Sequence, residues 1–200
     1  MLRVACSVVA RAGDATSDTQ HATRNTLTLR NRQRDRRLNL PFLRRVLQHL
    51  LAGQLQSTGH DLCFHFVTAE EMARVNWQFL RHEGSTDVIT FDYVAAELRR
   101  RNATRNQPVR LLTSAATPLH GEAFICVADA VKQAREFRTT WQCEVIRYAV
   151  HAVLHQRGYD DLQPAKRRVM KREENRLMRE LAQRFDLSKV ERESAAESRE

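Results

Sequence analysis

Residues 141–161 read WQCEVIRYAVHAVLHQRGYDD, and this stretch is the most informative part of the chain about its fold. The segment YAVHAVLH is apolar nearly all round, a pattern typical of a helix that is buried on most sides. Gly158 follows it and can end a helix in the left-handed conformation, which reverses the direction of the chain. The sequence therefore predicts a buried helix over residues 141–156 and a tight return that brings Asp160 and Asp161 back towards it.

Periodicity and capping signals predict the other elements on either side of this helix. Strands are predicted at TLTLR from Thr26, DLCFHFV, TDVITFDY and EAFIC, where residues alternate or are β-branched and aromatic. Helices are predicted to begin after Asn39, after Thr68, at Val127 and at Pro164. The order β α β α β, a loop and then β α α α indicates an α+β fold in which a small mixed β-sheet is covered by helices.

The composition along the chain predicts a single domain with loose ends. We expect a flexible basic segment over residues 1–25, one domain over 26–185 with a loop insertion at about 95–120, and a disordered charged tail over 186–200. The stretch VACSVVARA near the start resembles a short signal peptide. The Arg-rich, acid-poor composition up to Arg37 also suits an arm that attracts RNA.

The charge and the cysteine content indicate which kind of partner and which cellular compartment to expect. The chain has 33 Lys and Arg against 24 Asp and Glu, a formal charge of +9, which favours a polyanionic partner. The four cysteines are scattered without a C-x-x-C pair, so neither a disulfide framework nor a thiolate zinc site is indicated, and a reducing cytoplasm fits. No apolar run approaches the roughly 20 residues that cross a bilayer, so we expect no membrane partner.

The histidine pair in the central helix is the main chemical signal. His151 and His155 are four residues apart, so their imidazoles project from nearly the same helix face and can share one metal ion. Core histidines bonded to backbone or carboxylate groups are the alternative. A third ligand from Asp160 or Asp161 would complete a His, His, carboxylate set with an open fourth position, which is the arrangement of a catalytic zinc site.

These residues resemble the YbeY-type ribosomal RNA maturation endoribonucleases. The signature of that family has the form H-x3-H-x5-H, with Gly, Tyr and Asp before the last His, and HAVLHQRGYDD is similar to it except at Asp161, where the family usually has its third histidine. NWQFLRHEGSTDVITFDY resembles the family's Asn, Arg and T-D-V-L-S-F segment, and GEAFIC resembles its G-D-I-x-I-C strand. The resemblance covers roughly Thr26 to Leu181 and implies a mixed sheet with helices around a zinc cleft.

The resemblance implies a ligand set for one zinc ion per chain. It makes His151 and His155 ligands and places Asp161 at the position of the third. A carboxylate there lowers the charge of the centre relative to three neutral histidines, so a bound water should be less acidic and activity should peak at higher pH. Asp160 is a rival ligand; otherwise it is left to orient a histidine or to cap the following helix.

Three further residues are candidates for the site. Arg81 stands at a position that resembles the family's functional arginine, and a guanidinium suits a phosphate that gains charge, although a solvated arginine at a helix end is the alternative. Asp87 begins a strand expected to line the cleft, or it only hydrogen-bonds the loop that holds Arg81. Glu122 replaces an aspartate of the family pattern and is either a partner behind a metal ligand or a strand-end charge.

The resemblance implies cleavage of single-stranded RNA in small-subunit ribosomal RNA maturation and ribosome quality control, with the ribosome as a partner. Zinc would polarise a water or a phosphate oxygen while Arg81 offsets charge on the phosphate. A zinc peptidase or amidase is one alternative, but Ala152 stands where HExxH metallopeptidases carry their glutamate base. A non-catalytic ribosome-binding protein with a stabilising metal is another. The ligand types also accept other divalent metals, and no pattern predicts an oligomeric state.

Overall fold

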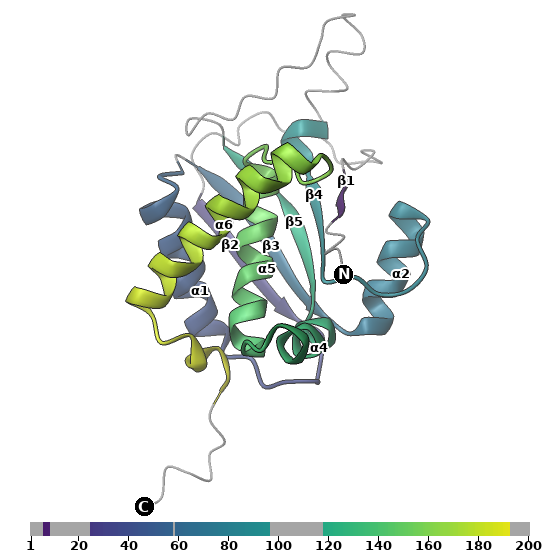
Figure 1. Ribbon diagram of the computed structural model, residues 1–200, viewed down its shortest axis with the longest axis horizontal. Coiled ribbons are helices and arrows are strands. Elements are labelled where there is room, and N and C mark those ends of the chain that lie inside the picture. The colour runs from purple at the N-terminus through teal and green to yellow at the C-terminus, as the bar shows by residue number, and fades with distance from the viewer. Residues whose placement is uncertain (1–5, 9–24, 58, 97–117, 193–200) are drawn as a thin grey trace, which may run out of the picture.

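The computed structural model describes residues 6–8, 25–57, 59–96 and 118–192, and Figure 1 shows them as helices arranged around one β-sheet. The strands are β1 (Cys6–Val8), β2 (Asn25–Asn31), β3 (His60–Val67), β4 (Val88–Asp92) and β5 (Leu119–Cys126), in the order β1-β4-β5-β3-β2. Strands β4 and β5 are antiparallel, and every other neighbouring pair is parallel. The prediction of a small mixed sheet is confirmed.

Five longer helices and shorter turns surround the sheet. They are α1 (Leu40–Gln48), which continues as a π-helical segment over His49–Gln54, α2 (Ala69–Leu80), α4 (Val127–Phe137), α5 (Trp141–Gln156) and α6 (Pro164–Arg184). Residues 93–96 form a short helical turn, and a 3-10 turn over Leu187–Val190 follows α6. Within the described residues, no helix combines the length and the apolar character needed to cross a bilayer.

Side-chain caps explain where the predicted helices begin. The Asn39 side chain accepts a hydrogen bond from the backbone N–H of Phe42, and Pro41 lies in the first turn of α1. The Thr68 hydroxyl accepts from the backbone N–H of Glu71 at the start of α2 in the same way. Each cap satisfies a backbone donor that the helix itself leaves unpaired.

The main core lies between one face of the sheet and helices α1, α5 and α6, which Figure 1 shows crossing that face. Most residues of α5 are buried, including Val150, Val153 and Leu154 at 0% exposure, so this helix is the centre of the domain. Burial of each such aliphatic side chain contributes about 1.5–3 kcal/mol. The apolar character of YAVHAVLH on all sides thus reflects packing on all sides.

Helix α2 packs on the opposite face of the sheet. Successive strand residues point to opposite faces, and Val88 belongs to the main core whereas its neighbour Ile89 packs with Met72 of α2 in a second, smaller cluster. Phe91 belongs to the same smaller cluster. The two faces of the sheet therefore carry different helices, which decides which side chains can reach α5.

The chain ends differ from the prediction where the structure describes them. Residues 6–8 lie in the segment expected to be flexible, but they pair with β4, with Cys6 opposite Ile89. Residues 186–192 lie in the tail expected to be disordered, but Leu187 and Val190 are buried in the main core. Charged residues flank these two apolar residues in the sequence, so the composition of the segment predicted a disordered tail. Residues 1–5, 9–24 and 193–200 lie outside the described residues.

Regular structure extends into both ends of the loop that was predicted at about residues 95–120. Residues 93–96 continue from β4 as a helical turn, and β5 already begins at Leu119, which is buried and pairs with His60 of β3. Pairing with a neighbouring strand extends β5 beyond the apolar run EAFIC that marked it in the sequence. Residues 97–117 lie outside the described residues.

Candidate metal centre

Helix α5 presents the two histidines side by side. Thr140 caps its start by accepting from the backbone N–H of Cys143, and the buried body of the helix holds its axis in place. His151 and His155 lie one turn apart, with ring centroids 4.7 Å apart and their Nε2 atoms 3.0 Å apart. Their side chains are 11% and 4% exposed, so both rings lie mostly out of solvent.

The turn after α5 returns the chain to these rings. Gly158 has a φ of 84°, in the left-handed region that glycine adopts readily. The backbone N–H of Tyr159 then donates to the Leu154 carbonyl, which closes the helix end. Asp161 is buried and lies with Oδ2 3.7 Å from His151 Nε2 and Oδ1 3.8 Å from His155 Nε2.

The carboxylate of Asp160 is hydrogen-bonded to groups other than the two histidines. Its Oδ1 accepts from the backbone N–H of Leu162, and its Oδ2 accepts from Lys166 Nζ at 3.0 Å. The backbone hydrogen bond from Leu162 and the nearby Lys166 ammonium hold the pKa of Asp160 below its usual range. The structure therefore brings Asp161, and not Asp160, to the histidine pair, while Asp160 stabilises the entry to α6.

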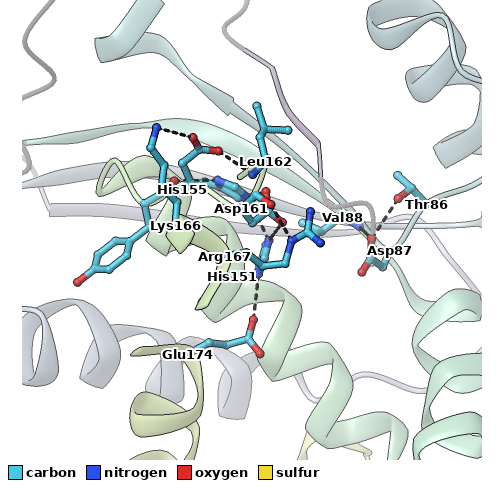
Figure 2. Close-up of polar contacts among 12 residues, drawn as sticks. Thr86, Asp87, Val88, His151, His155, Asp161, Leu162, Lys166, Arg167 and Glu174 are labelled. Carbon is cyan, nitrogen blue, oxygen red and sulfur yellow. Dashed lines mark hydrogen bonds and ion pairs between the residues drawn. The ribbon is translucent and has the colours of Figure 1, made fainter. Parts of the chain in front are cut away.

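Both histidines are oriented through their second ring nitrogen. His151 Nδ1 lies 2.9 Å from Oε2 of Glu174 on α6, and His155 Nδ1 lies 3.1 Å from the Tyr159 carbonyl oxygen (Figure 2). A carboxylate and a carbonyl only accept hydrogen bonds, so each Nδ1 must carry the hydrogen and donate it. In the neutral rings each Nε2 then holds a lone pair, and these two lone pairs point to the same small space.

Glu174 is itself fixed by an arginine of α5. It is buried at 4% exposure, and its Oε1 accepts from a terminal nitrogen of Arg147 at 2.8 Å. Burial raises the pKa of Glu174, but the hydrogen bonds and charges of His151 and Arg147 outweigh it and lower that pKa to about 2. Glu174 is therefore an anion that holds the His151 ring in place from behind.

The arrangement favours a metal cation over a proton between the rings. Burial and the adjacent His151 lower the pKa of His155 to about 4, so a proton is disfavoured there near neutral pH. Two lone pairs 3.0 Å apart repel unless a cation lies between them. Ligand atoms at the zinc distances of about 2.0–2.1 Å in tetrahedral geometry are about 3.4 Å apart. The separations of 3.0, 3.7 and 3.8 Å in this trio fit that spacing.

Arg81 and Asp87 lie on other elements. Arg81 forms the left-handed cap of α2, is exposed, and has its guanidinium carbon 5.9 Å from the centroid of the Trp77 ring. Asp87 is buried before β4, and its Oδ1 accepts from the Thr86 hydroxyl and the Val88 backbone N–H, both at 3.0 Å. Within the described residues, no hydrogen bond or ion pair joins Arg81 or Asp87 to the histidine trio.

Glu122 is on the wrong face of the sheet to support a metal ligand on α5. Its neighbour Gly121 faces α5, because a Cβ on Gly121 would lie 2.7 Å from Gln156 Nε2. Glu122 therefore points the other way, and its Oε2 lies 3.3 Å from His65 Nε2 on β3. The interpretation of Glu122 as a partner behind a metal ligand is wrong. Glu174 has that role instead, as the hydrogen-bond partner of His151.

Sequence reasoning missed Glu174, although a signal for it existed. Met170, Glu174, Leu177 and Leu181 follow one another at spacings of four, three and four, and all are buried on one face of α6. A carboxylate within such an apolar stripe requires a partner in the core. That pattern marks the position, but only the packing of α6 on α5 identifies His151 and Arg147 as the partners.

A mixed sheet with a buried helix that carries two histidines and a returning carboxylate defines an α+β protein with a site able to hold a metal ion. Residues 28–182 match the sequence model of the family described as Endoribonuclease YbeY. The chain belongs to this family, so the resemblance drawn from its three motifs is confirmed.

Known relatives cover most of the domain. The protein named Endoribonuclease YbeY from Salinibacter ruber is 28% identical over 152 residues, which span 76% of this chain and 89% of that protein. The protein of the same name from Chlorobium luteolum is 26% identical over 146 residues, 73% of this chain and 91% of that one. The solution structure of TM1509 from Thermotoga maritima has a TM-score of 0.54 and 17% identity, and the match covers 86% of this chain and 99% of that chain. This last likeness concerns the fold alone.

Proposed function

We propose that this protein is a zinc-dependent endoribonuclease that cleaves single-stranded RNA in the maturation and quality control of small ribosomal subunits. The observation that carries the proposal is the pair of His151 and His155 Nε2 atoms, 3.0 Å apart and beside Asp161, in a chain of the Endoribonuclease YbeY family. The relatives carry that name, and the formal charge of +9 favours a polyanionic substrate. A cytoplasmic location is part of the proposal, and the free thiols of Cys63, Cys126 and Cys143 are compatible with it.

Some residues of the site would hold the metal ion, and others orient its ligands. His151, His155 and Asp161 would hold one zinc ion, which would polarise a water molecule or a phosphate oxygen for hydrolysis. Glu174 and the Tyr159 carbonyl keep both rings in the tautomer that leaves Nε2 available. Arg81 is proposed to offset the charge of the phosphate in the transition state.

Position 152 favours phosphodiester hydrolysis over peptide hydrolysis. Metallopeptidases with the HExxH motif place their base next to the first histidine. Here that residue is Ala152, which is fully buried in the main core. A carboxylate at this position would face the core, so the site has no peptidase base there.

The test combines zinc stoichiometry with cleavage assays. Zinc content would be measured on the purified protein, and cleavage of a single-stranded oligoribonucleotide and of a generic peptide would be followed for wild type, His155→Ala and Arg81→Ala. His120→Ala is the matched control, because this histidine lies on β5 outside the trio. We expect bound zinc, RNA cleavage lost with His155→Ala, and no peptide cleavage. RNA cleavage that survives the loss of His155 would refute the proposal.

A further inference from the structure

A cavity of about 420 Å³ opens beside the histidine trio. It lies between the end of α4, the middle of α5 and the first half of α6, and both His151 and Asp161 line it. Its size is within the range of about 300–1,000 Å³ that is usual for small-ligand sites. Besides the two metal-site residues, the charged and aromatic side chains of its wall are three cations, two carboxylates and one ring: Arg147, Arg167, Lys171, Glu144, Glu174 and Phe137.

The three cations differ in their ion-pair and hydrogen-bond partners. Arg147 is neutralised, because Glu174 lies at 2.8 Å and Glu144 at 3.7 Å from its guanidinium. Arg167 donates from Nε to the backbone carbonyl of Asp161 at 2.8 Å, a bond that leaves both terminal nitrogens of the guanidinium available. Figure 2 shows Arg167 beside Asp161. Within the described part of the chain, no carboxylate forms an ion pair with Arg167 or Lys171.

Neighbouring cations of α6 do not share these features. Lys166 is paired with Asp160 at 3.0 Å, and Arg168 and Arg172 are exposed and do not line the cavity. The two unpaired cations at the cavity are therefore separated by one helical turn, at positions 167 and 171, and face the same space. An anion that enters the cavity beside the metal site meets both of them.

Phe137 contributes an aromatic ring to the wall of the cavity. It is the last residue of α4 and is 43% exposed, although it lines the cavity wall. An exposed aromatic ring next to unpaired cations is the combination that binds single-stranded nucleic acids, because the ring stacks on a base while the cations contact the backbone.

We propose that this cavity binds the nucleotide next to the scissile bond, with Arg167 and Lys171 on its phosphate and Phe137 stacked on its base. The inference rests on the proposed function and adds the residues that position the RNA strand. Arg167 is suited to its role because the hydrogen bond to Asp161 ties its guanidinium to the metal-binding turn. The phosphate contacts have no sequence preference, and stacking tolerates any base, so the site binds RNA without reading its sequence.

The test measures binding of RNA apart from its cleavage. A fluorescently labelled single-stranded oligoribonucleotide is titrated with the full-length chain in the presence of a chelator, over a series of salt concentrations. The variants are Arg167→Ala, Lys171→Ala and Phe137→Leu. Their matched controls are Arg168→Ala and Arg172→Ala, which remove the same charge from the same helix, and Phe79→Leu, which alters a 47% exposed phenylalanine on α2.

We expect Arg167→Ala and Lys171→Ala each to weaken binding by about tenfold at low salt. Each should also reduce the slope of log affinity against log salt by about 0.7, the value for one lost phosphate contact on a single strand. Phe137→Leu should weaken binding by about fivefold without changing the slope. An oligonucleotide without bases should bind wild type and Phe137→Leu equally.

The outcomes separate this inference from the proposed function. If the control variants weaken binding as much as Arg167→Ala and Lys171→Ala, while wild type still binds and cleaves RNA, the cavity is not the binding site and the proposed function stands. If wild type neither binds nor cleaves RNA, both this inference and the proposed function are refuted. Lys171 is exposed, so Lys171→Ala keeps the test valid even if Arg167→Ala disturbs the turn at Asp161.

Discussion

At the scale of single residues, the orientation of the two imidazoles depends on groups outside the motif that contains them. His151 is held by a carboxylate from α6, and His155 by a backbone carbonyl in the turn that follows its own helix. Both hydrogen bonds place the hydrogen on Nδ1 and leave Nε2 as the ligand atom. Substitutions of these partners should therefore alter metal affinity without removing a ligand.

Glu174→Gln is expected to weaken zinc binding by about 10–100-fold, because the neutral amide no longer holds the His151 ring as an anionic acceptor. The measurement is competition with a chromophoric chelator. Glu173→Gln is the control, since Glu173 pairs with Arg176 of the same helix and not with a histidine of the trio. Equal zinc affinities in the two variants would show that Glu174 does not support the site.

Titration of His155 predicts a pH dependence for the metal-free protein. Burial and the neighbouring His151 lower the pKa of His155 to about 4, from the ordinary value of 6.5. Above pH 6.5 the histidine is neutral in both the folded and the unfolded chain, so its contribution to stability is complete. As the pH falls from about 6.5 to about 4, only the unfolded chain gains the proton, and the free energy of unfolding should decrease by up to about 3 kcal/mol.

Urea unfolding at a series of pH values tests this expectation. His155→Gln removes the titrating group and should flatten the pH dependence between pH 6.5 and about 4. His120→Ala removes a histidine outside the trio and should leave it unchanged. The same steep dependence in His155→Gln would mean that another group causes the loss of stability.

At the scale of elements, the contact between β5 and α5 places the metal site over the sheet. Gly121 is a point of close approach, since a Cβ there would collide with the Phe91 carbonyl oxygen of the neighbouring strand and lie 2.7 Å from Gln156 Nε2. The backbone carbonyl cannot move without disturbing the β4–β5 pairing, in which Gly121 lies opposite Asp92. Glycine is therefore required by space and not by backbone conformation.

Gly121→Ala should lower the free energy of unfolding by about 1–3 kcal/mol through overpacking against the backbone. Urea denaturation measures the change. Gly53→Ala is the control, because the nearest atoms to its new Cβ belong to the His49 side chain, which can rotate, and its effect should be smaller than about 1 kcal/mol. If both variants unfold at the same urea concentration as wild type, the close approach at Gly121 is not tight.

At the scale of the whole molecule, the C-terminal segment closes the domain against the start of α1. The backbone N–H of Asn39 donates to the Val190 carbonyl, and that of Arg192 donates to the Arg37 carbonyl, both at 2.8 Å. Leu187 and Val190 are buried in the same core as α5. Residues 186–192 therefore belong to the folded domain, which extends beyond the boundary at residue 185 that the sequence predicted.

A chain that ends at Phe185 should be less stable than one that ends at Arg192 by about 3–6 kcal/mol, the value of burying two aliphatic side chains. Thermal and urea unfolding of the two truncated chains would measure the difference. Val190→Ala in the full chain provides a milder change, expected to cost about 2 kcal/mol. Indistinguishable unfolding midpoints for the two truncations would contradict the closing role of this segment.

The local parts of this structure were determined by the sequence alone. The start of α4 and both ends of α5 were predicted at their observed residues, because apolar periodicity and caps such as Thr140 act within a turn or two of the chain. The i, i+4 spacing of His151 and His155 and the left-handed Gly158 also act within two turns, so the return of Asp160 and Asp161 towards the histidine pair could be predicted, whereas the choice of Asp161 came from the family resemblance.

Only the tertiary structure decided which distant side chains support the site. Glu174 reaches His151 because α6 packs across α5, and their separation of 23 residues along the chain carries no spacing that encodes this contact. Glu122 fails for the same reason, since the face to which it points depends on the sheet's placement against α5. Periodicity and capping arise from interactions within a few residues, whereas these partners depend on how separately formed elements pack, which is a property of the whole molecule.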